Sequence, residues 1–219
     1  MCKLLSFSIG GNPGFGVLDG GKVFDLGKRL PGVPDLRSLL SAGGFERAAT
    51  AIAGATADYD VAQITLEPVI PNPGKILCIG LNYQDHVAET QRARTQVPTV
   101  FTRFSDTLVG HAGAVIKPRH SDKVDYEAEL AVIIGKPGRD IPRERAAEHV
   151  AGYACFNDVS IRDFQGHTSQ FTPGKNFPGT APFGPVLVSA RALGEVGPQR
   201  IQSRLNGKVM QSDNTDNMM

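Results

Sequence analysis

Residues 124–135, VDYEAELAVIIG, place two carboxylates two positions apart at the start of an otherwise apolar run. In an extended strand, side chains alternate between two faces, so Glu127 and Glu129 share a face with Ala131 and Ile133. Because that face continues into apolar residues, we expect the two glutamates to point towards the protein interior. The alternative interpretation is an ordinary amphipathic strand whose glutamates lie in water.

Two carboxylates on one strand face predict a cation site. Their Cα atoms lie about 6.6 Å apart, at roughly 3.3 Å of rise per residue, so their oxygen atoms can converge. Two unpaired charges about 5 Å apart repel by roughly 3 kcal/mol at an effective dielectric constant of about 20. A divalent cation would turn this repulsion into binding. Oxygen ligands, with no Cys or His at zinc spacing, favour Mg²⁺ or Mn²⁺, and Ca²⁺ is a further candidate.

A third oxygen ligand is available at the end of the next apolar run, GYACFND at residues 152–158. Asp158 follows this expected strand, where an acidic side chain is well placed to meet the two glutamates. The alternative is that Asp158 only caps a turn or a helix.

A second cluster lies in LNYQDHVAET, where His86 and Glu89 are three residues apart. On a helix they would share a face, and Glu89 would orient an imidazole that can take a proton from water near neutral pH. Surface pairs of this kind are common, so the spacing alone does not establish catalysis. Lys175, in the loop TPGKNFPG, gains a functional interpretation only if that loop folds over the cation site.

The overall composition excludes several kinds of partner. With 23 basic and 22 acidic residues the net charge is +1, which gives no field to attract nucleic acid or an anionic membrane. Three widely separated cysteines provide neither a disulfide framework nor a metal knuckle, and they favour a reducing compartment. The first apolar run is too short for a signal peptide, and no segment reaches the roughly 18 apolar residues of a membrane span. We therefore expect a cytoplasmic protein.

The 25 glycines and 15 prolines predict many turns between short strands. Short strands joined by hairpins are expected over residues 4–26, followed by helices at 35–42 and 45–53. The glycine-rich run at 10–16 lies between two strands and predicts a hairpin rather than a phosphate-binding loop.

The proline-rich stretch LEPVIPNPGK at residues 66–75 predicts an extended connector, because proline is excluded from helix interiors and central strands. We place a boundary there, between a small β-rich N-terminal domain over residues 1–70 and a larger domain over 71–219.

The larger domain also reads as short strands with few helices. We expect a buried strand at 75–81 and further strands at 99–104, 124–134, 152–158 and 185–190. We also expect a helix at 141–150, a long loop at 164–185 and a hairpin around Asn206 and Gly207. This pattern favours a β-rich α+β fold. A Rossmann-type fold is disfavoured, because strands and helices do not alternate and no G-x-G-x-x-G opens a helix.

Several segments together closely resemble the fumarylacetoacetate hydrolase family. In family order they are KILCIGLNYQDHVAE, DYEAELAVIIGK, VAGYACFNDVSIRDFQ, GKNFPGTAPFGPVLV and LNGKVMQSDNT. The first 70 residues resemble the small β-rich domain that many bacterial members carry. The resemblance implies a catalytic domain of mixed β-roll type that usually forms a homodimer. Family members continue beyond the last of these segments, so we expect the C-terminal part of the catalytic domain to be truncated.

The resemblance also implies roles for individual side chains. The implied metal ligands, for Mg²⁺ or Mn²⁺, are Glu127, Glu129 and Asp158. The implied catalytic groups are His86, Glu89 and Lys175. The implied substrate contacts are Gln165, Arg103 and Arg162.

These groups would permit enolate chemistry on a small 2-oxo acid, whose carboxylate and 2-oxo oxygen would chelate the cation. Our first interpretation is a hydrolase that cleaves a C–C bond of an acylpyruvate, such as fumarylpyruvate, in aromatic compound catabolism. The family also includes decarboxylases of oxaloacetate-like acids and isomerases of 2-hydroxymuconate-like acids, and the sequence does not separate these. A non-catalytic binding protein with the same fold is a further alternative.

Overall fold

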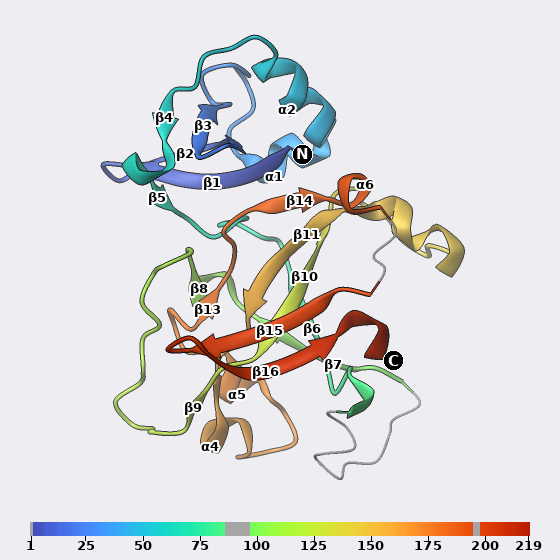
Figure 1. Ribbon diagram of the computed structural model, residues 1–219. Coiled ribbons are helices and arrows are strands. Elements are labelled where there is room, and N and C mark those ends of the chain that lie inside the picture. Colours follow the sequence, from blue (N-terminus) through green and yellow to red (C-terminus); the bar gives the residue numbers. More distant parts are fainter. Residues whose placement is uncertain (1, 86–96, 195–197) are drawn as a thin grey trace.

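The N-terminal strands form a meander whose turns are made by glycine pairs. The computed structural model describes residues 2–85, 97–194 and 198–219 (Figure 1). Its first strands are β1 (Lys3–Ile9), β2 (Asn12–Asp19), β3 (Lys22–Asp25), β4 (Tyr59–Asp60) and β5 (Thr65–Leu66). Gly10 and Gly11 turn β1 into β2, and Gly20 and Gly21 turn β2 into β3, all with positive φ. Such turns require positive φ at both central residues, so the predicted hairpins are confirmed.

Two short helices cover these strands. They are α1 (Leu36–Ser41) and α2 (Gly44–Ile52), close to the predicted ranges. Asp35 caps α1 because its carboxylate accepts a hydrogen bond from the Ser38 backbone N–H at 2.7 Å. Leu36 and Leu39 of α1 are fully buried, and they pack into the core with Leu4 and Phe15.

The remaining described residues form short strands and short helices. The strands are β6 (Ile76–Gly80), β7 (Thr99–Arg103), β8 (Leu108–Val109), β9 (Val124–Asp125), β10 (Ala128–Ile134), β11 (Val150–Asn157), β12 (Ser160–Ile161), β13 (Ala181–Pro182), β14 (Leu187–Ser189), β15 (Arg200–Leu205) and β16 (Lys208–Asn214). The α-helices are α4 (Arg162–Gln165), α5 (Thr172–Lys175) and α6 (Ala190–Leu193). The 3₁₀ helices are η1 (Val61–Gln63), η2 (Ser105–Thr107), η3 (Arg143–His149) and η4 (Thr215–Asn217). No helix in the described ranges has the length and apolar character needed to cross a bilayer.

One eight-stranded sheet runs through both parts of the chain, in the order β10-β11-β14-β1-β2-β3-β4 with β5 also on β1. Strand β14 joins the parts, because it pairs with β1 on one side and β11 on the other. The main core likewise combines Leu4 and Phe15 with Ile133, Ala154 and Leu187. The sheet thus crosses the predicted boundary, and the division into domains at residue 70 stays a prediction.

The segment that carries the two glutamates differs from the prediction. It is two strands, β9 and β10, and Tyr126 and Glu127 lie between them. β9 pairs with β12, whereas β10 pairs with β11, so the pairing partner changes at the break. The inward direction of the Glu129 face is confirmed by buried Ile133, whereas Val132 and Ile134 on the other face are 50% and 63% exposed.

Three further expectations need correction. Strand β6 is not buried on both faces, because Leu77 and Ile79 are exposed. The helix expected at 141–150 is the exposed 3₁₀ helix η3. The long loop expected at 164–185 contains helix α5 and strand β13. In each case the local sequence does not show which other segments of the folded chain pack against the run.

The predicted hairpin at Asn206 and Gly207 is confirmed, with positive φ at both residues.

The junction through β14 leads to a test of the continuous sheet. A Cβ atom on Gly152 would lie 2.0 Å from the Val188 carbonyl oxygen. We expect Gly152→Ala to lower the free energy of unfolding by about 2 kcal/mol, because the backbones of β11 and β14 would have to separate. Urea denaturation gives the value, and Gly166→Ala, whose Cβ would make only ordinary contacts, is the control. Equal midpoints for both variants would contradict this account of the junction.

Candidate active site

Two of the predicted acidic residues are brought together by the end of β11. Asp158 directly follows this strand and is 3% exposed. Its backbone N–H donates to the Glu127 carbonyl oxygen at 3.0 Å, and the Glu127 N–H donates to Asn157 Oδ1 at 3.0 Å. Asp158 does not cap a helix, since Ile161 is the residue that precedes α4. The strand break therefore places Glu127 directly beside Asp158.

Lys175 lies between these carboxylates. Its Nζ is 2.8 Å from Glu127 Oε2 and 2.6 Å from Asp158 Oδ2, and the side chain is 1% exposed. The ammonium also lies 5.1 Å from the centre of the Phe101 ring, a cation–π distance. Lys175 ends helix α5, so the segment expected to be a loop does fold over the acidic residues. Removing one partner of such a buried pair leaves an uncompensated charge.

Glycine allows α5 to reach this position. A Cβ on Gly174 would lie 2.4 Å from the Gln165 backbone nitrogen, so α5 packs on the end of α4 with no room for a side chain. The Asn176 side chain ties the same turn to β7, because its Nδ2 donates to the Thr102 carbonyl and its Oδ1 accepts from the Phe104 N–H. Lys175 is therefore held from both sides along the chain.

Arg103, one of the predicted substrate contacts, is directed at Asp158 in this structure. It is 2% exposed, and its Nη1 donates to Asp158 Oδ1 and, at 3.1 Å, to the Val159 carbonyl. Its Nη2 donates to Thr180 Oγ1 at 2.8 Å. These contacts fix the Asp158 carboxylate. A direct contact between Arg103 and a substrate stays a prediction.

Arg162 and Gln165, the other predicted substrate contacts, interact with each other and with the acidic segment. Arg162 Nη1 lies 2.7 Å from Glu127 Oε1 and donates to Gln165 Oε1 at 2.8 Å, and its Nη2 lies 2.8 Å from Asp125 Oδ2. The Ser160 hydroxyl donates to the same Glu127 oxygen at 2.9 Å. Arg162 thus holds Glu127 and links it to α4, and the roles of Arg162 and Gln165 towards a substrate stay predictions.

Glu129 is the acidic residue without a cation of its own. Among the described residues, no hydrogen bond or ion pair involves its carboxylate. Burial raises the pKa of Glu129 to about 7, and the negative charges of Glu127 and Asp158 add to this effect while Lys175 opposes it. The Glu129 carboxyl is therefore partly protonated near neutral pH, and it is the member of the cluster that has no positive partner among the described residues.

The predicted pair His86 and Glu89 lies outside the described residues. The segment that leads to His86 lies close to Glu129, since the Glu129 charge affects Tyr83. Tyr83 lies three positions before His86, and burial raises the pKa of its hydroxyl to about 12, with a contribution from the Glu129 charge. The Tyr83 hydroxyl is buried and has no hydrogen-bond partner among the described residues.

The three acidic residues suit a hard divalent cation, because all the ligands that they offer are carboxylate oxygens. In the described part of the chain, however, no three His, Cys, Asp or Glu side chains are arranged so that they hold an ion as they stand. The ammonium of Lys175 lies between Glu127 and Asp158. An ion bound by all three carboxylates therefore requires Lys175 to move away from at least one of them.

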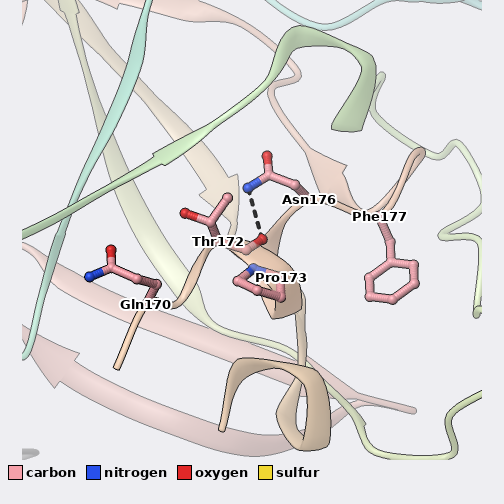
Figure 2. A pocket seen from close by; sticks show the side chains of 5 residues that line it. All are labelled: Gln170, Thr172, Pro173, Asn176 and Phe177. Atoms are coloured by element: carbon pink, nitrogen blue, oxygen red, sulfur yellow. Dashed lines mark hydrogen bonds between the residues drawn. The ribbon is translucent and has the colours of Figure 1, made fainter. Parts of the chain in front are cut away.

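A hollow of about 510 Å³ lies on the segment that carries Lys175. It is lined by Gln170, Thr172, Pro173, Asn176 and Phe177, and Figure 2 shows the Asn176 amide bonded to the Thr172 carbonyl on one wall. None of the three acidic residues lines this hollow.

Sequence reasoning missed the polar residues that orient the acidic ones. Asn157 and Ser160 both contact Glu127, and Thr180 holds Arg103. Asn157 and Ser160 flank Asp158 in FNDVS, and polar side chains grouped at the end of an apolar strand were an available signal. Thr180 gave none, because its contact with Arg103 spans 77 residues of sequence.

The buried ammonium gives a stability prediction. In chelator, Lys175→Met leaves Glu127 and Asp158 facing each other, so we expect the free energy of unfolding to fall by about 3 kcal/mol. Added Mn²⁺ should stabilise this variant more than the wild type, because the ion would replace the missing positive charge. Urea denaturation with and without Mn²⁺ measures both effects. Lys136→Met, which removes an exposed lysine 3.9 Å from Glu148, is the control, and equal losses in the two variants would refute the prediction.

Cys78 gives a prediction on thiol reactivity. Burial raises its pKa to about 12, and the neighbouring Asp158 charge adds to the effect. At pH 8 only about one thiol in ten thousand would then be the reactive thiolate. We expect iodoacetamide to modify the exposed Cys155 well before Cys78, and Cys78 labelling to rise about tenfold per pH unit up to pH 10. Peptide mass spectrometry measures both rates, and equal rates at pH 8 would be the contrary result.

The chain matches one known protein family over most of its length. The family model described as fumarylacetoacetate (FAA) hydrolase C-terminal matches residues 75–219. The mitochondrial oxaloacetate tautomerase fahd2 of Xenopus laevis is 35% identical over 226 residues, which cover 99% of this chain and 71% of that protein. The chain spans between 50% and 71% of the length of the eight curated relatives compared with it.

Solved structures agree with this match. The fumarylacetoacetate hydrolase of Exiguobacterium antarcticum superposes with a TM-score of 0.79 at 31% identity, over 100% of this chain and 77% of that one. The maleylpyruvate hydrolase of Sphingobium sp. SYK-6, in complex with manganese(II) and pyruvate, gives a TM-score of 0.80 at 26% identity, over 99% and 78% of the two chains. Together with the matched segment and the β-rich fold, these similarities show that the chain belongs to the fumarylacetoacetate hydrolase family.

Proposed function

We propose that this chain supplies the acidic centre of a divalent-metal-dependent enzyme that forms the enolate of a small 2-oxo acid. The observation that carries the proposal is the buried Lys175 ammonium beside the carboxylates of Glu127 and Asp158, with the unpaired carboxyl of Glu129 close to them. A buried group of fixed charges of both signs can stabilise negative charge that develops on a substrate oxygen.

The side chains divide into those that would hold an ion and those that would bind substrate. Glu127, Glu129 and Asp158 would hold Mg²⁺ or Mn²⁺. The ion would supply positive charge next to the carboxylate and 2-oxo oxygen of the substrate. Lys175, once displaced from between the carboxylates, can donate a hydrogen bond to the same substrate oxygens. Arg103 and Arg162 keep Asp158 and Glu127 in place during this exchange.

Keto–enol tautomerisation of an oxaloacetate-like acid is the reaction that the described residues support best. It removes a proton from C3 and places one on the 2-oxo oxygen, and it consumes no water. It therefore requires enolate stabilisation and a group that carries the proton, for which His86 and Glu89 are the predicted groups. A relative that matches 99% of this chain bears the name oxaloacetate tautomerase. This order differs from our first interpretation of the sequence, which favoured hydrolysis.

Hydrolysis of an acylpyruvate is the second candidate. Water would add to the distal carbonyl and the C–C bond would break, giving a carboxylic acid and the pyruvate enolate, which then takes a proton. The step also needs a general base, for which His86 and Glu89 are the predicted groups. It is supported by the structural likeness to a maleylpyruvate hydrolase crystallised with manganese(II) and pyruvate. A homodimer, a cytoplasmic location and a role in aromatic catabolism also stay predictions.

Removal of one charge tests the proposed site. Glu129→Gln removes a carboxylate without breaking any ion pair seen among the described residues. We expect Mn²⁺-dependent turnover to fall at least about 100-fold, because metal-assisted charge stabilisation contributes several kcal/mol. Glu144→Gln, on the exposed helix η3, is the matched control and should behave as the wild type.

The assay should distinguish the two reactions. Enol and keto oxaloacetate are followed by ultraviolet absorbance, and acylpyruvate cleavage by release of pyruvate, each with Mg²⁺, Mn²⁺ or chelator. Turnover that persists unchanged in chelator, or in Glu129→Gln, would overturn the metal-dependent assignment. Failure of the wild type to bind either ion and to turn over either substrate would support the alternative of a binding protein.

A further inference from the structure

A glutamine of the C-terminal hairpin holds the backbone on both sides of Glu127. Gln211 lies on β16, and its Oε1 accepts a hydrogen bond from the Ala128 N–H at 3.0 Å. Its Nε2 donates to the Tyr126 carbonyl oxygen at 3.0 Å. Ala128 and Tyr126 are the immediate neighbours of Glu127. The side-chain amide of Gln211 therefore bonds to the backbone on both sides of Glu127.

The two hydrogen bonds of Gln211 lie at a break between two strands, and this explains why an amide side chain is suited to them. Tyr126 and Glu127 lie in the break between β9 and β10, where the strand changes its pairing partner. Backbone donors and acceptors at such a break still need partners. A glutamine amide offers one donor group and one acceptor, as a neighbouring strand would. Gln211 therefore takes the place of the missing strand pairing at the break.

The amide is itself held in one orientation. The Ser203 hydroxyl of β15 donates to Gln211 Oε1 at 2.9 Å, and the two residues are aligned partners in the β15–β16 ladder. A flipped amide would place its NH₂ group against the Ala128 N–H. Figure 1 shows the hairpin of β15 and β16 passing in front of β10, which agrees with these contacts. The orientation is thus set by three hydrogen bonds.

The residues that follow this hairpin contact the segment that leads to the predicted histidine. The Met219 backbone N–H donates to the Asn82 carbonyl at 2.9 Å, and Met218 forms a bridge with Tyr83. Asn82 and Tyr83 directly precede the segment that contains His86. Residues 211–219 therefore contact both the acidic segment and the residues that precede His86.

We propose that Gln211 is a positioning residue for the cation site, acting through the backbone of Glu127. This inference rests on the proposed function, because it concerns the same carboxylates. The direction of the Glu127 side chain depends on the two peptide units that Gln211 holds, and Lys175 and Arg162 approach that carboxylate from fixed positions. A small tilt of the backbone would therefore change how Glu127 meets Asp158.

The test compares two glutamines of one hairpin. Gln211→Met keeps the volume but removes both hydrogen bonds to the acidic segment. Gln202→Met is the matched control, since the Gln202 amide donates to Ser212 within the hairpin. We expect Mn²⁺ affinity, measured by calorimetric titration, to fall about 10- to 100-fold in Gln211→Met and to stay within twofold in the control. Turnover should fall mainly through kcat, and amide exchange at Ala128 should accelerate only in Gln211→Met.

The outcomes separate this inference from the proposed function. If the wild type binds no Mn²⁺, the proposed function fails and this inference fails with it. If the wild type binds Mn²⁺ and Gln211→Met binds it equally well, only the role of Gln211 is overturned. If Gln211→Met does not fold, Gln211→Asn, which keeps the amide uncharged but is one methylene too short to make both hydrogen bonds, replaces it in the same comparison with the same expected order of affinities.

Discussion

The buried ammonium of Lys175 is the interaction on which the acidic centre depends. Three carboxylates gathered inside a protein repel one another strongly, and taking them out of water is costly. Lys175 compensates two of them directly, at 2.8 Å from Glu127 and 2.6 Å from Asp158. Without it, Glu127 and Asp158 would face each other with only Arg162 and Arg103 to compensate their charges. The close packing of Gly174 on Gln165 serves this one contact.

Part of this arrangement could be predicted from local pattern. The alternation of side chains in AELAVII indicated that Glu129 faces inward, and the apolar run before Asp158 indicated a strand that ends beside the glutamates. Both follow from the two-residue period of a strand and need no knowledge of the partners. The glycine pairs that set the N-terminal hairpins were readable for the same reason, because positive φ is a local requirement.

The rest depends on contacts between residues far apart in sequence. The strand break at Tyr126 and Glu127 arises because β9 and β10 pair with different strands, which the composition of the segment does not encode. The residue that an arginine side chain contacts is equally difficult to predict from the sequence. Arg103 lies in a segment that suggested a substrate contact, yet its guanidinium meets Asp158, 55 residues later. Only the tertiary path of the chain decides whether such a side chain faces a ligand or a neighbouring carboxylate.

The carboxylates of Glu127 and Asp158 are held in the same manner, and this arrangement is consistent with the proposed replacement of Lys175 by a metal ion. Asp158 uses Oδ1 for Arg103 and Oδ2 for Lys175. Glu127 uses Oε1 for Arg162 and Ser160, and Oε2 for Lys175. In each case one oxygen is anchored to the surrounding scaffold, and the other faces the lysine. If Lys175 moved away, the anchored oxygens would stay in place. Glu127 Oε2 and Asp158 Oδ2 would then keep their directions and could accept a cation, with Glu129 close by.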